Sequence, residues 1–174
     1  MFTSIDKIIR SLEFITEQVG RLVSWLVLFM VLVTFIVVVL RYVFNIGWIA
    51  LQESVIYAHA MVFMLGAAFS LKHQQHVRVD VFYQRMSKKS RAWVDIFGTV
   101  AFLIPVSVFI LFSSFEYVVE SIELQEGSRD AGGLPFVYLL KTQILCMAAL
   151  LLMQAIAEIL KNSLVIMRPA PVES

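Results

Sequence analysis

Four apolar stretches, each long enough to cross a lipid bilayer, constrain this chain more than any other feature. They cover residues 22–44, 48–71, 95–116 and 135–160. A bilayer core of about 30 Å needs roughly 20 helical residues at 1.5 Å rise per residue. Composition agrees, because 60% of the 174 residues are hydrophobic and only 16% are charged. We therefore predict an all-α membrane protein, a single domain over residues 1–174 with four transmembrane helices.

The 14 lysines and arginines are distributed unevenly between the two sides of these spans. One side, formed by both termini and a basic loop over residues 72–94, carries eleven: Lys7, Arg10, Arg21, Lys72, Arg78, Arg85, Lys88, Lys89, Arg91, Lys161 and Arg168. The other side, which includes an acidic segment over residues 116–134, carries three: Arg41, Arg129 and Lys141. Because cytoplasmic flanks are enriched in positive charge, we predict that both termini and the basic loop are cytoplasmic.

The segment before the first span has the pattern of an amphipathic helix over residues 3–20. Apolar residues recur at helical spacing, at Ile5, Ile8, Ile9, Leu12, Ile15, Val19 and Leu22. Such a helix suits the membrane interface, where its apolar face enters the headgroup region. A straight extension of the first span, packed on a partner, has the same periodicity, so the pattern leaves both arrangements open.

The first two spans form an antiparallel hairpin, because only residues 45–47 separate them. Arg41 lies about one turn before this connection and Glu53 about a turn and a half after it. We predict an ion pair between them, shielded by Trp48, that locks the two spans together. In the alternative, both side chains simply extend to the polar headgroups.

One face of the second span combines small and polar residues. Gln52, His59 and Gly66 follow one another at intervals of seven residues, which places them on one side of a helix. This pattern favours close packing with a neighbouring helix and hydrogen bonding within lipid. The competing interpretation is that His59 ligates haem, but a bis-histidine site within this chain would need a second histidine on a facing span.

The sequence contains no phosphate-binding glycine loop, no metal-ligand cluster and no nucleophile beside a base. We therefore predict no enzymatic activity, and no catalytic, cofactor-binding or metal-binding residue. The basic loop has the charge to bind anionic phospholipids, and nothing in the chain indicates a nucleic-acid partner. Three acidic residues, Glu116, Glu120 and Glu123, form a stripe that is either solvated or docks a periplasmic partner.

Several short segments together resemble one family, the small DctQ-type membrane subunits of tripartite ATP-independent periplasmic (TRAP) transporters. In chain order they are Arg41-Tyr42-Val43-Phe44-Asn45, Trp48, Gln52-Glu53, Gly66-Ala67-Ala68 and His76-Val77-Arg78-Val79-Asp80. The resemblance covers nearly the whole chain, including its length and its four spans. It makes Arg41, Trp48, Glu53, Gly66, His76 and Asp80 motif positions, for which we expect structural or partner-interface roles.

The resemblance implies a sodium-coupled system that takes up small organic acids across a bacterial inner membrane. In such systems a periplasmic binding protein captures the substrate, and a large many-span subunit holds the substrate and sodium sites and moves by an elevator mechanism. The small subunit packs against the static scaffold of the large one. The substrate stays open, whether a 2-oxo acid, another carboxylate or a sugar derivative.

Two other functions remain as alternatives to the accessory subunit. The chain could be a haem or quinone anchor of a respiratory enzyme, or an autonomous small carrier that works as a dimer. The sequence shows no internal inverted repeat of the kind that many complete carriers contain.

Overall fold

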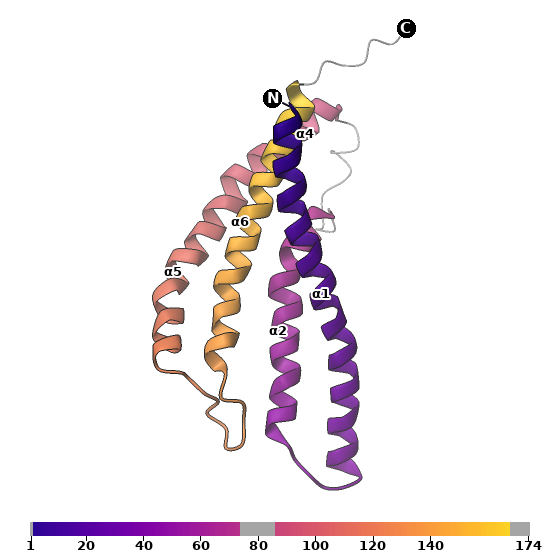
Figure 1. Ribbon diagram of the computed structural model, residues 1–174, viewed down its shortest axis with the longest axis vertical. Coiled ribbons are helices and arrows are strands. Elements are labelled where there is room, and N and C mark those ends of the chain that lie inside the picture. Colours follow the sequence, from indigo (N-terminus) through magenta and orange to yellow (C-terminus); the bar gives the residue numbers. More distant parts are fainter. Residues whose placement is uncertain (1, 74–85, 168–174) are drawn as a thin grey trace.

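The computed structural model describes residues 2–73 and 86–167, and within them every regular element is helical. The elements are α1 (Phe2–Tyr42), α2 (Ile49–Lys72), α4 (Lys88–Gly98), the π-helical η1 (Thr99–Leu103), α5 (Ile104–Glu123) and α6 (Val137–Met167), as Figure 1 shows. Four continuous helical stretches, 5–42, 49–72, 88–123 and 137–167, are long and apolar enough to cross a membrane. The predicted all-α fold with four spans is confirmed. The motif positions His76 and Asp80 lie outside the described residues.

The first helix is one continuous element of 41 residues, so the amphipathic segment 3–20 extends the first span directly. Its continuity matches the straight extension, and its packing on a partner stays a prediction. Its buried side chains include Ile9 and Thr16, which are 8% and 1% exposed. The segment therefore packs on the rest of the chain through part of its surface.

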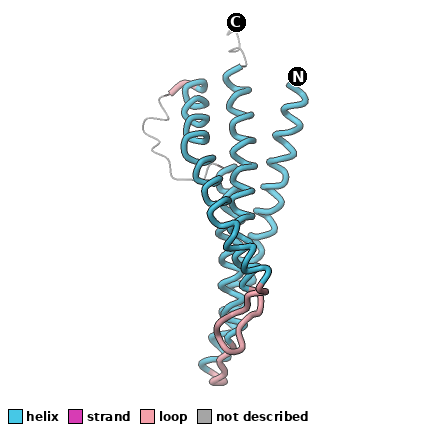
Figure 2. Tube along the Cα trace, turned by 90° about the vertical axis from the view of Figure 1, so that its left-hand side faces the viewer, coloured by secondary structure: helices cyan, strands magenta, loops and turns pink. Residues whose placement is uncertain are grey.

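The helices form an open layer in the order α1, α2, α6, α5. Helix α1 packs mainly on α2, and α5 packs mainly on α6, while α2 and α6 join the two pairs. Figures 1 and 2 show the resulting elongated shape, with both termini at one end and the helix connections 43–48 and 124–136 at the other. We call these the terminal end and the loop end.

Helix α6 is central in this layer and supplies more of its buried residues than any other helix. It contacts α2, α4, α5 and, toward the terminal end, α1. Its buried residues are mostly small or polar: Gln143, Ala148, Gln154, Ala155, Ala157 and Leu164. Alanines let neighbouring helices approach closely, which is the usual basis of helix association in lipid.

The third span begins inside the region predicted as a loop, because Ser87 caps α4. Its side chain accepts a hydrogen bond from the backbone N–H of Ser90 at 3.2 Å, as serine commonly does at a helix start. The helix widens into a π turn at 99–103, directly before Pro105. Proline lacks a backbone N–H and crowds the preceding turn, which accounts for an interruption at this position.

Candidate functional sites

The Glu53 side chain fastens α2 to the segment 124–136 at the loop end. One carboxylate oxygen accepts a hydrogen bond from the Ser128 hydroxyl, and the other accepts one from the backbone N–H of Leu134. The Ser128 backbone N–H in turn donates to the Leu134 carbonyl at 3.0 Å, so the two anchoring residues also hold each other. Through these two hydrogen bonds, the Glu53 carboxylate holds the segment 124–136 against the second span.

Glycine is required twice in this segment for different reasons. Gly132 has a φ of +81°, a conformation that residues with a Cβ rarely adopt. Gly133 lies against the anchor itself, since a Cβ added there would come within 2.7 Å of Glu53 Oε1 and would also overlap Ser128. The pair of glycines therefore lets the segment close over the Glu53 carboxylate.

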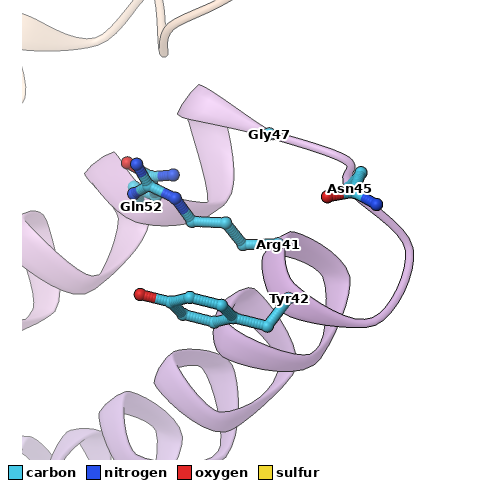
Figure 3. A pocket seen from close by; sticks show the side chains of 5 residues that line it. All are labelled: Arg41, Tyr42, Asn45, Gly47 and Gln52. Atoms are coloured by element: carbon cyan, nitrogen blue, oxygen red, sulfur yellow. The ribbon is translucent and has the colours of Figure 1, made fainter.

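The predicted ion pair between Arg41 and Glu53 is not formed. Glu53 points to the segment 124–136, where the Ser128 hydroxyl and the Leu134 N–H already satisfy it. Arg41 is exposed and lines a groove of about 530 Å³ with Tyr42, Asn45, Gly47 and Gln52 (Figure 3). The prediction failed because a segment 75 residues further along the chain supplies the donors for Glu53.

A second cluster at the loop end joins α5 to α6 around Lys141. The ammonium donates to the carboxylate of Glu126 and lies 3.9 Å from the ring centroid of Tyr117. The Ser121 hydroxyl donates to the same Glu126 oxygen at 2.7 Å. These donors, Lys141 first, hold the pKa of the Glu126 carboxyl below its ordinary value. This cluster holds the start of the segment 124–136 through Glu126, and Glu53 holds its end through Leu134.

At the C-terminal end of α2, away from the loop end, the Glu17 carboxylate of α1 contacts two basic side chains. It lies 2.8 Å from Lys72 Nζ and 3.0 Å from His73 Nε2. Arg21, one turn along α1, approaches the other oxygen at 3.0 Å. Lys72 also donates to the backbone carbonyl of Glu13 at 3.1 Å. The hairpin of α1 and α2 is thus closed at the end opposite its turn.

Two buried polar side chains join α1 to α6. The Thr16 hydroxyl lies 3.1 Å from Gln154 Oε1, and the two residues are 1% and 0% exposed. Gln154 Nε2 also donates to Glu158 at 3.3 Å. Buried polar atoms without partners are costly, so this contact aligns the N-terminal part of α1 with α6.

The remaining predicted positions lie on the surface of the described chain. His59 is exposed in the middle of α2, and Gly66 is half-buried with open space where a Cβ would stand. Trp48, 57% exposed, precedes the first residue of α2. The stripe of Glu116, Glu120 and Glu123 is exposed on the last turns of α5, as the sequence predicted.

The histidines do not form an axial haem pair in the described part of the chain. His73 contacts Glu17 and the ring of Phe69 at the C-terminal end of α2. It lies 14 residues from His59 on one continuous helical path, which is about 21 Å along the axis. Nor does any group of three or more His, Cys, Asp or Glu side chains within residues 2–73 and 86–167 converge to hold a metal ion.

The sequence matches the family described as tripartite ATP-independent periplasmic transporters, DctQ component, over residues 30–164. The chain belongs to the DctQ family. No curated protein and no solved structure matches it. With four candidate spans and this membership, it is a multi-pass membrane protein and the small subunit of a TRAP transporter.

The DctQ match includes the whole loop end, with Glu53, Ser128, Glu126 and Lys141. It begins after Thr16, so the terminal-end contacts of α1 lie before the matched range. Sequence reasoning singled out Glu53 but missed its partners Ser128 and Leu134. The only available signal was the Glu-Gly-Ser and Gly-Gly-Leu-Pro composition of the connection, which marks a turn and not a particular contact.

Proposed function

We propose that this DctQ-type chain is an accessory scaffold subunit of a sodium-coupled TRAP transporter for small organic acids. It packs beside a large many-span membrane subunit and has no substrate site, cofactor or enzymatic activity of its own. A periplasmic binding protein delivers the substrate, and sodium binds the large subunit. The protein resides in a bacterial inner membrane with its terminal end in the cytoplasm, where the basic loop 72–94 meets phospholipid headgroups.

The family match over residues 30–164 is the observation that carries this proposal. The placement of charge supports it, because Glu17, Glu53, Glu126 and Lys141 all serve contacts between helices or connections near the two ends. In many secondary transporters the substrate and coupling-ion sites lie near the bilayer midplane. Here these charged groups instead join helices and connections of the chain to one another, as a scaffold requires.

Transport by reconstituted proteoliposomes tests the proposal. Vesicles with an inward sodium gradient would contain this chain alone, the large subunit alone, or both, each with the purified binding protein and a panel of labelled organic acids. We expect flux only when both membrane subunits are present. Flux through vesicles containing this chain alone would establish an autonomous carrier and overturn the accessory role.

A further inference from the structure

One face of α2 has the residue spacing of a helix-packing seam but no helix packed on it. The positions Gln52, Ile56, His59, Phe63, Gly66 and Ser70 alternate steps of four and three residues. This spacing keeps side chains on one line along a helix and is typical of a seam that receives another helix. Ile56 and Phe63 on this line are 59% and 72% exposed. We call this line of residues the free face of α2.

The free face borders a groove with α1 in the half of the hairpin nearer the terminal end. The groove has a volume of about 510 Å³, and its α2 wall includes Phe63, Gly66 and Ser70. Gly20 and Ser24 of α1 contribute to the opposite wall. A Cβ at Gly66 would meet no atom within 4 Å, so no contact among the described residues requires a glycine at this position. In lipid, glycines at a helix surface are used where a second backbone approaches closely.

The position of His59 favours a protein, and not lipid, as the occupant of the free face. It lies ten residues after Ile49 and thirteen before Lys72, at the middle of the span, and it is exposed. Within the described residues its imidazole has no hydrogen-bonding partner. Acyl chains cannot supply one, and ionisable side chains at membrane depth almost always face the interior of a helix bundle or a water-filled cavity. A helix of a second chain packed on this face would supply the partner that lipid cannot.

The loop end of the same face carries positive charge. Arg41 extends from α1 toward Gln52, the first residue of the free face, across the groove drawn in Figure 3. Its guanidinium makes no ion pair with any acidic residue in 2–73 or 86–167. An acidic side chain on the occupant would complement this charge, because a guanidinium forms strong paired hydrogen bonds with a carboxylate.

We propose that the free face of α2 binds a transmembrane helix of the large subunit, with close backbone approach at Gly66 and a hydrogen-bonding group against His59. That helix carries an acidic residue at its loop end, facing Arg41. This inference rests on the proposed function and adds to it the surface through which the two subunits meet. It also gives roles to Arg41, His59 and Gly66, which the contacts among residues 2–73 and 86–167 leave without one.

Two glycine substitutions provide a matched test. Gly66→Leu fills the space on the free face, whereas Gly98→Leu adds the same side chain on the third span, where a Cβ likewise meets nothing within 4 Å. Each variant would be co-expressed with the large subunit and purified through a tag on the small one. We expect Gly66→Leu to lower the ratio of large to small subunit at least about tenfold and Gly98→Leu to change it less than about twofold, since tenfold corresponds to 1.4 kcal/mol of binding energy.

Cysteine cross-linking keeps the inference testable if Gly66→Leu fails to fold. In a Cys146→Ala background, Phe63→Cys on the free face, labelled with a thiol-reactive photo-cross-linker, should cross-link to the large subunit, and the identically labelled Phe109→Cys on α5, where the native residue is 71% exposed, should not. Cross-linking of Phe63→Cys to a second copy of this chain, or of Phe109→Cys to the large subunit instead, would overturn the inference. If the wild-type chain does not co-purify with any large subunit, the proposed function itself fails.

Discussion

Replacing Thr16 by valine and Gln154 by leucine, singly and together, tests whether the N-terminal part of α1 is held on α6. The Thr16 hydroxyl and Gln154 Oε1 are 3.1 Å apart in a site from which water is excluded. In Thr16→Val the Gln154 oxygen stays buried without a donor, which costs about 1–3 kcal/mol. At about 2–4 °C per kcal/mol for a chain of this size, the melting temperature should fall by between about 2 and 12 °C.

The structure also predicts how the two substitutions combine. In Gln154→Leu the Thr16 hydroxyl still has the Leu12 carbonyl at 3.3 Å, so it keeps a partner, but Glu158 loses the donor at 3.3 Å. The double variant contains no orphaned Gln154 oxygen. Its destabilisation should therefore be smaller than the sum of the two single effects by about 0.5–1.5 kcal/mol, the usual net value of one hydrogen bond.

Thermal unfolding of the four proteins in the same mild detergent, followed by circular dichroism, measures this coupling. Gln143→Leu provides a control on the same helix, because Gln143 is 5% exposed and its amide makes no hydrogen bond among the described residues. Its effect should add independently to that of Thr16→Val. If the effects of Thr16→Val and Gln154→Leu simply add as well, the two side chains do not meet and residues 2–20 do not pack on α6 as described.

Three further predictions concern the loop end. Gly133→Ala should free the segment 124–136 from α2, because the new methyl group overlaps the Glu53 anchor; protease cleavage within this segment should become faster, and an unchanged rate would contradict the anchor. Glu53→Arg should impair assembly and Arg41→Glu should not rescue it in the double variant, since the two residues do not pair; rescue would restore the ion-pair hypothesis. Because the pKa of Glu126 is lower in the folded protein than in the unfolded chain, its contribution to stability is present above the ordinary carboxyl pKa and is lost as pH falls through the folded value. The melting temperature of Glu126→Gln should thus fall less than that of the wild type as pH is lowered from 7 to well below the ordinary carboxyl pKa, and equal slopes over that range would refute the assignment.

Hydrophobic length was sufficient to predict the four spans. This feature is local, because a span depends on about 20 consecutive residues. The acidic stripe on α5 was predictable for the same reason. Helix α4 begins at Lys88, before the apolar stretch that hydropathy marks from about residue 95, because polar residues after a cap continue a helix as readily as apolar ones.

The partners of Glu53 and Thr16 could not be predicted, because both contacts join positions far apart in the sequence. Ser128 lies 75 residues beyond Glu53, and Gln154 lies 138 residues beyond Thr16. The nearest opposite charge to Glu53 in the hairpin is Arg41, so a local rule selects the wrong partner. Both contacts depend on how α2 packs on α6 to join the two helix pairs. Hydropathy does not predict this packing.

Whether this chain is bound to a large subunit in its native membrane can be measured by purifying the tagged chain in mild detergent and identifying the bound proteins by mass spectrometry. We expect a many-span membrane protein that co-purifies in a fixed ratio and is lost on Gly66→Leu but retained on Gly98→Leu. A chain that is recovered folded and alone, from membranes that contain the large subunit, would contradict this expectation.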